Sequence, residues 1–223
     1  MKTFNKDPNF SIVLPGGCNA ACSFCFNKDV NKGVKTIPIA DYIKSLDKTL
    51  KSLPEQFYQI SITGGEPLLS PYVIPVLSLI STMKDKFTNI IITTNGTNLK
   101  GMIEYVSMAV DHINISRHHF DEKMNKDIFK GSYNVTDDDL IEIIDLYSKK
   151  GIDVSLNCVI NNTTEKKFID NYISYAQSMG FQAVRFRKEN GTLDKTPVEL
   201  EFADYKILWE GSCPVCRTTL QNI

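Results

Sequence analysis

The 223-residue sequence predicts an α/β fold in which strands and helices alternate along the chain and the strands form one parallel sheet. Six short apolar runs of strand length are separated by segments with helical periodicity. This alternation is typical of parallel sheets whose strands are joined by right-handed crossovers. The length and the hydrophobic content of 42% suit one domain of ordinary size. The runs lie near residues 11–16, 58–63, 89–94, 112–117, 153–160 and 183–188.

The helical segments show apolar residues three or four positions apart. Pro75 lies early in the segment 71–86, so this helix is expected to start late or to be kinked. In the later segments Thr136 is the expected N-cap of one helix, and Gly151 and Gly180 follow the ends of two. The apolar faces consist of Tyr42, Leu46 and Leu50, then Leu140, Ile143, Ile144 and Tyr147, and then Phe168, Tyr172, Ile173 and Ala176.

Several predicted strands alternate polar and apolar residues, although parallel strands covered on both faces are normally apolar throughout. Side chains switch face with a period of two. If the apolar set packs against the helices, the polar set faces the inside of the sheet, which predicts an open interior for polar ligands. The alternative is that some of these strands are edge strands or face solvent. The polar set consists of Gln59, Ser61, Thr63, Asn114, Ser116, Ser155, Asn157, Arg185 and Arg187.

The charge balance argues against several partners. With 25 basic and 26 acidic residues, the net charge of −1 gives no general attraction to nucleic acid or anionic lipid. No apolar run approaches the roughly 20 residues of a membrane helix, and the N-terminus lacks the apolar stretch of a signal peptide. Clustered cysteines in such a chain favour metal binding over disulfides. We therefore expect a cytoplasmic protein without membrane contact and without a nucleic-acid polymer as partner.

Three cysteines near the start of the chain, Cys18, Cys22 and Cys25, are close enough for one short loop to present three thiolates. A [4Fe–4S] cluster bound in this way keeps its fourth iron open for a ligand that is not protein. The alternative is a tetrahedral zinc site, which needs a fourth ligand. A second pair with CxxC spacing, Cys213 and Cys216, could supply it. The cysteines alone leave both kinds of site open.

Two further motifs follow predicted strands. Gly64, Gly65 and Glu66 interrupt an apolar run within the sequence Gly-Gly-Glu-Pro. Glycines let a backbone come close to a ligand, and a carboxylate accepts hydrogen bonds from an ammonium group. Asn95 follows two threonines at the end of the third strand, in the sequence Thr-Thr-Asn-Gly. Both motifs are expected at the edge of the sheet where the strands end.

The CxxxCxxC, GGEP and TTNG motifs together resemble those of the radical S-adenosylmethionine (SAM) enzymes. The resemblance implies a partial (β/α)6 barrel, similar to an incomplete TIM barrel, which we assign to residues 1–190, with a tail over residues 191–223. It implies that Cys18, Cys22 and Cys25 bind a [4Fe–4S] cluster and that the open iron binds SAM.

The active site of such a barrel is expected at the C-terminal ends of the strands. The resemblance implies SAM contacts for residues on that rim. It implies that Phe24 and the backbone near Ile160 lie near the adenine, and that the backbone of Gly64 and Gly65 and the side chain of Glu66 bind the amino group. It also implies that Ser116 contacts the carboxylate or the ribose, that Asn157 contacts the ribose, and that Asn95 lies at the cofactor.

Candidate substrate residues follow the fourth strand and lie on the sixth. Arg117, His118 and His119 replace the aspartate common in the family and begin a segment, up to about Asn134, that lacks convincing periodicity. A long loop is usually functional, and a histidine can bind substrate or transfer a proton. The alternative is that the histidines face solvent or cap a helix.

Arg185 and Arg187, on the sixth strand, suit a carboxylate or a phosphate. The alternative is an internal ion pair, for instance with Glu189. In the tail, Cys213 and Cys216 resemble the start of an auxiliary-cluster site. No third cysteine follows them up to Ile223, and Cys158 is expected to face the helices, so we predict one cluster per chain and free thiols in the tail. The alternative is a second metal site shared between chains.

The resemblance implies an enzyme that reductively cleaves SAM to a 5′-deoxyadenosyl radical, which takes hydrogen from a substrate, with a flavodoxin or ferredoxin-type reductant. A small anionic metabolite or nucleotide is favoured by the arginines and by a partial likeness to the viperin-type branch. A peptide is the alternative, because the fifth strand is similar to that of the molybdopterin-precursor and SPASM/twitch branches. From a different class, the alternative is a non-catalytic zinc or iron–sulfur binding protein.

Overall fold

A computed structural model of the protein describes residues 9–25, 36–53, 58–161, 163–188, 208–209 and 219–222. Its strands are β1 (Asn9–Leu14), β2 (Tyr58–Gly64), β3 (Phe87–Thr94), β4 (His112–Ser116), β5 (Asp153–Ile160), β6 (Ala183–Lys188), β7 (Leu208–Trp209) and β8 (Thr219–Asn222). Its α-helices are α2 (Ile39–Ser52), α3 (Val73–Ser81), α4 (Ile103–Ala109), α5 (Glu122–Phe129), α6 (Asp137–Ser148) and α7 (Lys166–Ser178). Short 3-10 turns are η1 (Pro67–Leu69), η2 (Lys84–Lys86) and η3 (Lys100–Met102).

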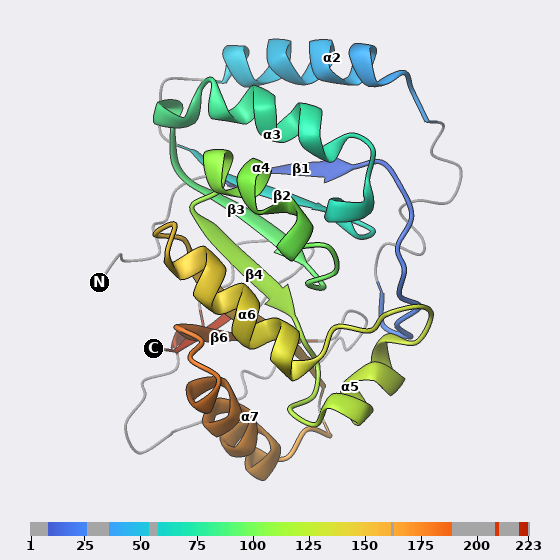
Figure 1. Cartoon of the computed structure of the whole chain (residues 1–223), viewed down its shortest axis with the longest axis vertical. Coiled ribbons are helices and arrows are strands. Elements are labelled where there is room, and N and C mark those ends of the chain that lie inside the picture. Colours follow the sequence, from blue (N-terminus) through green and yellow to red (C-terminus); the bar gives the residue numbers. More distant parts are fainter. Residues whose placement is uncertain are drawn as a thin grey trace.

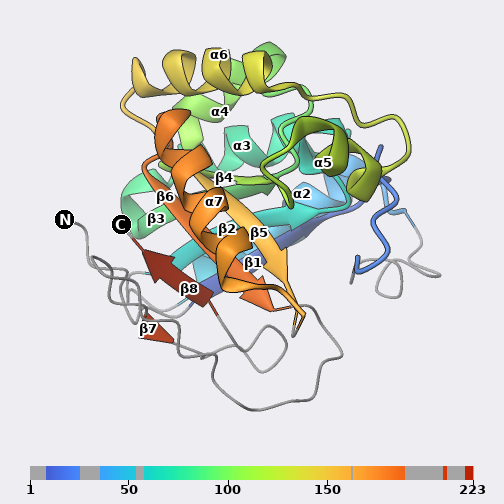
Figure 2. The same ribbon diagram turned by 90° about the horizontal axis from the view of Figure 1, so that it is seen from below.

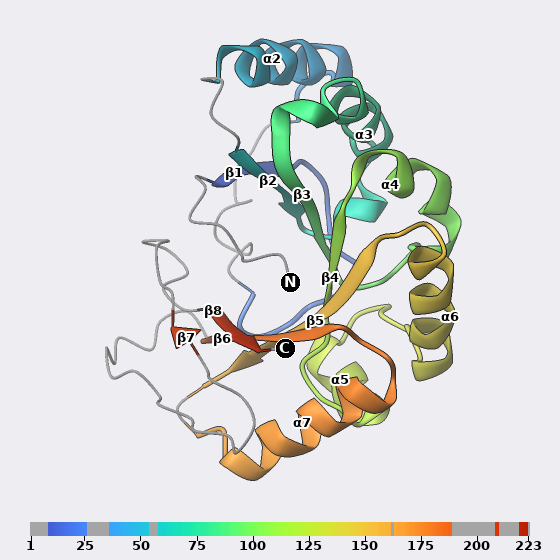
Figure 3. The ribbon, with the colours of Figure 1, turned by 90° about the vertical axis from the view of Figure 1, so that its left-hand side faces the viewer.

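All of these strands belong to one sheet with the order β1-β2-β3-β4-β5-β6-β8-β7. Neighbours from β1 to β6 are parallel, whereas β8 is antiparallel to both β6 and β7. The sheet is curved, and the described strands leave it open between its two ends (Figure 3). The predicted partial barrel of six parallel strands is therefore confirmed. The two antiparallel strands extend this sheet beyond β6, which the sequence did not predict.

Helices α2, α3, α4, α6 and α7 follow one another along the outer, convex side of the sheet (Figures 1 and 3). The apolar residues of the strands face them. Ile60, Ile90 and Ile113, from three neighbouring strands, are fully buried in this layer. On β6 the ring of Phe186 lies 5.5 Å from that of Tyr172 on α7. Each such side chain stabilises the fold by about 1.5–3 kcal/mol through burial, so this layer is the core.

The helix ends agree with their sequence signals. Thr136 and Asp139 form a capping box at the start of α6. Gly151 and Gly180 have φ values of +73° and +85°, the left-handed region that glycine adopts without strain. Pro75 does not delay α3, which begins at Val73. A proline in the first turn is tolerated because the N–H that it lacks would have no helical partner there.

The segment after β4 contains a helix where the sequence predicted an irregular loop. Helix α5 starts at the N-cap Asp121, whose side chain accepts a hydrogen bond from Met124 N. Only Asn125 and Phe129 on this helix are buried. A helix of two turns with one polar and one apolar buried residue carries too little periodicity to be recognised. In Figure 2, α5 lies beside the dark blue segment that follows β1.

None of the helices in the described ranges is long and apolar enough to cross a lipid bilayer.

Candidate active site

The loop that follows β1, residues 15–25 and here called the cysteine loop, carries three free thiols. Cys18 is exposed, Cys22 is buried and Cys25 is partly buried. Burial raises the pKa of the Cys18 thiol, and a hydrogen bond from Ala20 N at 3.4 Å opposes this. In the described part of the chain, no three Cys, His, Asp or Glu side chains meet closely enough to hold a single metal ion. Three thiolates can hold a cubane iron–sulfur cluster with one iron left open, whereas a structural zinc site needs a fourth protein ligand.

The double glycine lets the end of β2 pack directly against the cysteine loop. A Cβ atom on Gly65 would lie less than 3.0 Å from the carbonyl oxygen of Gly17. A Cβ atom on Gly64 would lie 2.7 Å from the carbonyl oxygen of Leu14. Glu66 N donates a hydrogen bond to Gly17 O at 3.0 Å. Glycine is therefore required at both positions because the chain's own backbone leaves no room for a Cβ atom.

Glu66 is a buried carboxylate, only 1% exposed, beside the cysteine loop. It accepts hydrogen bonds from Leu68 N (3.1 Å), Thr94 Oγ1 (2.6 Å) and Asn95 N (2.7 Å). Burial raises its pKa to about 7, although the three donors oppose the shift. Among the residues described, no lysine or arginine forms an ion pair with Glu66. A carboxylate has about four acceptor positions, so one remains for a cation.

The side chain of Asn95 forms hydrogen bonds within the protein. Its Nδ2 donates to Asn19 Oδ1 at 2.8 Å, and its Oδ1 accepts from Thr97 N at 2.9 Å. Asn19 Nδ2 in turn donates to Thr97 Oγ1 at 3.0 Å. In the structure these bonds make Asn95 a residue that positions the cysteine loop, and its predicted place at the cofactor stays a prediction. Asn19 lies inside the cysteine motif, and its hydrogen bonds to Asn95 and Thr97 were not predicted from the sequence.

Asn157 on β5 is 4% exposed, yet neither its Nδ2 nor its Oδ1 has a hydrogen-bond partner among the residues that the structure describes. It lies in register between Ser116 on β4 and Arg185 on β6. Ser116 is partly buried at the end of its strand. Buried amides are nearly always hydrogen-bonded, so an orphaned one indicates a missing ligand. The ribose contact of Asn157 and the carboxylate or ribose contact of Ser116 stay predictions.

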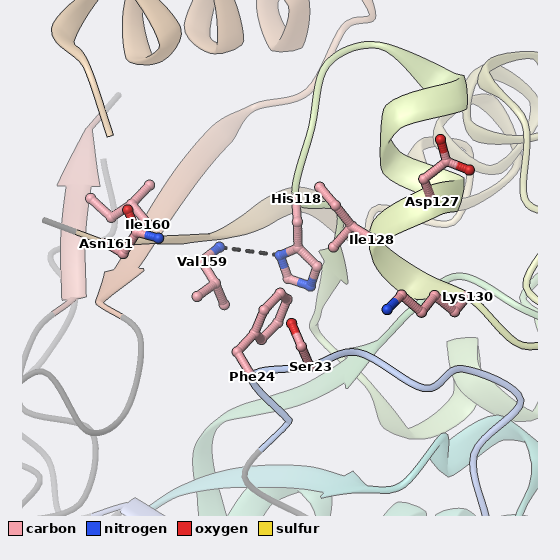
Figure 4. A pocket seen from close by; sticks show the side chains of 9 residues that line it. All are labelled: Ser23, Phe24, His118, Asp127, Ile128, Lys130, Val159, Ile160 and Asn161. Carbon is pink, nitrogen blue, oxygen red and sulfur yellow. Dashed lines mark hydrogen bonds between the residues drawn. The ribbon is translucent and has the colours of Figure 1, made fainter. Parts of the chain in front are cut away.

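A cavity of about 390 Å³ opens between the cysteine loop, α5 and the end of β5 (Figure 4). Phe24 from the cysteine loop and Ile160 from the end of β5, both predicted near an adenine, line this cavity. His118 contacts Phe24 edge to face, with ring centroids 4.8 Å apart. The lining consists of Ser23, Phe24, His118, Asp127, Ile128, Lys130, Val159, Ile160 and Asn161.

The two histidines after β4 have local partners. His118 Nδ1 accepts a hydrogen bond from Val159 N at 3.1 Å, and burial lowers its pKa to about 3. His119 Nδ1 accepts from Asp121 N at 2.9 Å, beside the start of α5. Burial also lowers the pKa of His119. His119 thus bonds the N-cap residue of α5, and a neutral His118 supports the wall of the cavity.

Arg117 lies on the helix side of the sheet, which corrects its prediction as a substrate residue. It is completely buried and forms an ion pair with Asp137 on α6 at 2.6 Å. Its guanidinium lies over the ring of Tyr175, 5.2 Å from the centroid. Because side chains alternate along a strand, the residue after Ser116 points away from the polar face.

Arg185 lies on the inner, polar face of the sheet. Its Nη1 donates to Asn114 Oδ1 and to Ser155 Oγ (3.1 Å), and lies 3.0 Å from His112 Nε2. Burial, together with nearby Arg187, lowers its pKa to about 10. The cluster confirms that these alternate polar residues share one face. His112 was assigned no role from the sequence, because a histidine at a strand start carries no distinctive spacing.

Arg187 is partly buried and pairs in register with Val159, two residues closer to the end of β6 than Arg185.

Cys158 is buried, and burial places the pKa of its thiol far above the usual range. It neighbours Tyr172 of α7, so the prediction that it faces the helices is confirmed. The predictions for Cys213 and Cys216, and for an ion pair with Glu189, lie outside the described residues.

The chain is similar to proteins of known function. Over 206 residues it is 25% identical to GTP 3′,8-cyclase from Clostridium perfringens (strain SM101 / Type A), which covers 90% of this chain and 56% of that protein. It is 28% identical over 172 residues to GTP 3′,8-cyclase from Limosilactobacillus fermentum (strain NBRC 3956 / LMG 18251), covering 74% of this chain and 49% of that protein. The chain thus spans about half the length of the curated relatives it matches.

Among solved structures, Streptococcus suis SuiB bound to its precursor peptide SuiA has a TM-score of 0.64 at 18% identity, covering 82% of this chain and 40% of that one. This likeness shows a shared fold. Residues 12–172 match the family model described as the Radical SAM superfamily, whose cofactors are a [4Fe–4S] cluster and SAM. This match includes the cysteine loop, Glu66, Ser116 and Asn157. The chain belongs to the radical SAM superfamily.

Proposed function

We propose that this chain is an enzyme that uses SAM and a [4Fe–4S] cluster bound by Cys18, Cys22 and Cys25 to abstract hydrogen from a small anionic metabolite or nucleotide. The observation that carries the proposal is the position of Glu66. A buried carboxylate without an ion-pair partner among the described residues lies against the loop that presents three thiols. The superfamily match makes SAM the cation that this arrangement fits.

The surrounding residues fit the parts of SAM. Glu66 has an acceptor position left for the ammonium group, which would bring its pKa back down. The orphaned amide of Asn157 suits the ribose hydroxyls, and Phe24 and Ile160 line a cavity large enough for an adenine. When bound, the two cofactors supply a 5′-deoxyadenosyl radical that abstracts hydrogen. The chain's own residues orient the reactants and exclude water around them.

The polar inner face of the sheet supports an anionic substrate. Arg185 and Arg187 extend from β6 toward this face, and arginine matches the geometry of carboxylates and phosphates. The name of the Clostridium perfringens relative, GTP 3′,8-cyclase, supports a nucleotide. A flavodoxin or ferredoxin-type reductant is proposed as the electron donor.

The ligand assignment is tested by replacing each loop cysteine with Ala and reconstituting the protein anaerobically with iron and sulfide. Wild-type protein should hold about four irons per chain, the content of one cubane cluster. Each single variant should lose the cluster's visible absorbance and all cleavage of SAM. Cys158→Ala, a buried cysteine outside the loop, is the matched control and should keep both. A loop variant that cleaves SAM at the wild-type rate would refute the assignment.

The substrate class is tested by adding nucleoside triphosphates, or a pool of short peptides, to reduced enzyme with SAM. Formation of 5′-deoxyadenosine above the substrate-free background is the signal. A rise with a nucleotide supports the proposal. A rise with peptides alone would replace it with a peptide substrate, the class of molecule that is bound in the SuiB structure.

A further inference from the structure

The cysteine loop is bonded to a segment distant in sequence, Phe129–Ser132 at the end of α5. Ala21 N donates to Phe129 O at 2.7 Å, and Ser132 N donates to Asn19 O at 2.8 Å. This reciprocal pair of backbone bonds resembles one rung of an antiparallel ladder. The bonds lie on either side of Ala20, so they hold the stretch that joins Cys18 to Cys22.

Gly131 makes this contact possible. Its φ is +63°, and a Cβ atom there would lie less than 3.0 Å from the carbonyl oxygen of Asn19. A second neighbour, the Asn19 carbonyl carbon, would lie at 3.2 Å. Both atoms belong to the backbone of the cysteine loop, so relief requires that loop to move. Lys130 also has a positive φ, +55°, with ψ at −162°, a sparsely populated conformation that costs a non-glycine residue about 1–3 kcal/mol.

Interactions within the core hold the segment in this strained position. Asn125 is completely buried, and its Oδ1 accepts from His118 N (2.8 Å) and His119 N (3.3 Å). The ring of Phe129 stacks on Tyr133, with centroids 4.1 Å apart, and also contacts His118 at 4.9 Å. Strained backbone persists only where its surroundings enforce it. The end of α5 is therefore a rigid support.

The other side of the cysteine loop is held independently. Glu66 N bonds to Gly17 O, and Asn95 bonds to the side chain of Asn19. Two anchored sides leave little freedom to the loop that carries the thiols. Groups fixed before binding lose less entropy when the ligand arrives.

We propose that Phe129–Ser132, which we call the α5 clamp, is a positioning element that sets the conformation of the cysteine loop for cluster binding. Gly131 is its critical residue, because any side chain at this position pushes against Asn19. The proposal rests on the proposed function in taking Cys18, Cys22 and Cys25 as the cluster ligands. It adds that the segment after β4, where this chain departs from the family pattern, serves the cluster loop.

The test compares Gly131→Ala with Gly151→Ala and Gly180→Ala. All three glycines have positive φ values, so each variant has left-handed strain, but at Gly151 and Gly180 a Cβ atom would meet nothing within 4 Å. The full-length variants are reconstituted anaerobically, and iron loss to a ferrous chelator is followed by absorbance. Gly131→Ala should lose iron roughly tenfold faster or more, since a displacement near 1 Å is costly at a preorganised site. The two controls should match wild type.

A second measurement needs no cluster. In metal-free protein, the rate at which a disulfide reagent modifies the loop thiols should change in Gly131→Ala and not in the controls. Phe129→Leu keeps the backbone bonds but loses the ring stacking, and should show the same changes to a smaller degree. If Gly131→Ala does not fold, the Phe129→Leu variant tests the role of the α5 clamp in its place.

The proposed role of the α5 clamp would be wrong if Gly131→Ala behaved like Gly151→Ala in both measurements. If Gly131→Ala does not fold, wild-type iron loss and thiol reactivity in Phe129→Leu would contradict it. Failure of the ligand assignment is a separate result. It would show as a cluster retained in Cys22→Ala, while thiol reactivity in metal-free protein would still test the clamp.

Discussion

Two buried polar residues at the rim of the sheet, Glu66 and Asn157, differ in how their hydrogen-bonding groups are satisfied. Glu66 accepts three hydrogen bonds and links the ends of β2 and β3. In the described part of the chain, the amide of Asn157 has no hydrogen-bond partner. A buried polar group without partners costs about 1–3 kcal/mol. Glu66 therefore contributes to folding through these bonds, whereas the amide of Asn157 contributes none, which is consistent with the ligand-binding role proposed for it.

At this scale we predict that Asn157→Ala weakens SAM binding without destabilising the fold. Loss of a neutral hydrogen bond, worth about 0.5–1.5 kcal/mol, should raise the Kd for SAM by roughly 2–12-fold. The melting temperature of the metal-free protein should stay the same or rise, because an unsatisfied buried amide is removed. Spectroscopic titration of the reduced cluster with SAM, together with thermal unfolding, measures both effects.

The control for Asn157 is Asn114→Ala, on the neighbouring strand. Asn114 Oδ1 accepts hydrogen bonds from Arg185 and from Ser155 Oγ at 2.9 Å. Its loss should lower the free energy of unfolding and leave the Kd for SAM nearly unchanged. A destabilised Asn157→Ala with normal SAM binding would show that Asn157 is a structural residue.

Helices α5 and α6 begin with comparable N-caps but contact different parts of the molecule. Asp121 accepts from Met124 N at 2.8 Å, and Thr136 accepts from Asp139 N at 3.1 Å. Helix α6 packs on the outer side of the sheet, whereas α5 ends in the clamp that meets the cysteine loop (Figure 2). Equal damage to the two helix starts should therefore have unequal effects on the cluster.

We predict that Asp121→Ala and Thr136→Ala each lower the free energy of unfolding by about 1 kcal/mol, the usual cost of a lost N-cap. Only Asp121→Ala should also speed iron loss from the reconstituted protein, since fraying of α5 loosens its support of the cysteine loop. Urea unfolding and the chelator measurement give the two quantities. Equal iron-loss rates in both variants would mean that the start of α5 does not influence the loop.

The molecule as a whole places two arginines on opposite sides of one curved sheet. Arg117 points outward and is paired with Asp137, while Arg187 lies on the inner side near the rim. Helices cover the outer side of the sheet, and the described strands do not close it into a full barrel (Figure 3). The architecture thus separates an arginine that supports the fold from one suited to a substrate.

We predict that Arg187→Gln keeps the slow, substrate-free formation of 5′-deoxyadenosine and loses turnover of the nucleotide found in the substrate screen. A charge-assisted contact worth about 1.5–3 kcal/mol corresponds to roughly 10–150-fold in kcat/KM. Arg117→Gln should instead lower the free energy of unfolding, on the order of 2 kcal/mol. If Arg187→Gln also abolishes the substrate-free reaction, Arg187 belongs to the cofactor site or to folding.

Much of the fold and of the cofactor site could be predicted from local sequence. The alternation of polar and apolar residues indicated which side of each strand faces the helices, as Phe186 and Arg185 illustrate. The spacing of Cys18, Cys22 and Cys25 indicated a cluster loop. Helix α5 escaped detection because its eight residues bury only one apolar side chain.

Local patterns were enough to establish the succession of strands and helices, the face on which each strand residue lies and the three thiols of the cysteine loop, because periodicity and spacing are local properties. Only tertiary packing brings Asn95 to Asn19, across 76 positions, and sets Gly131 against the same residue. These contacts depend on the curvature of the sheet and on the path of the segment after β4. No local pattern encodes either, so the support of the cysteine loop emerges only when distant segments pack together.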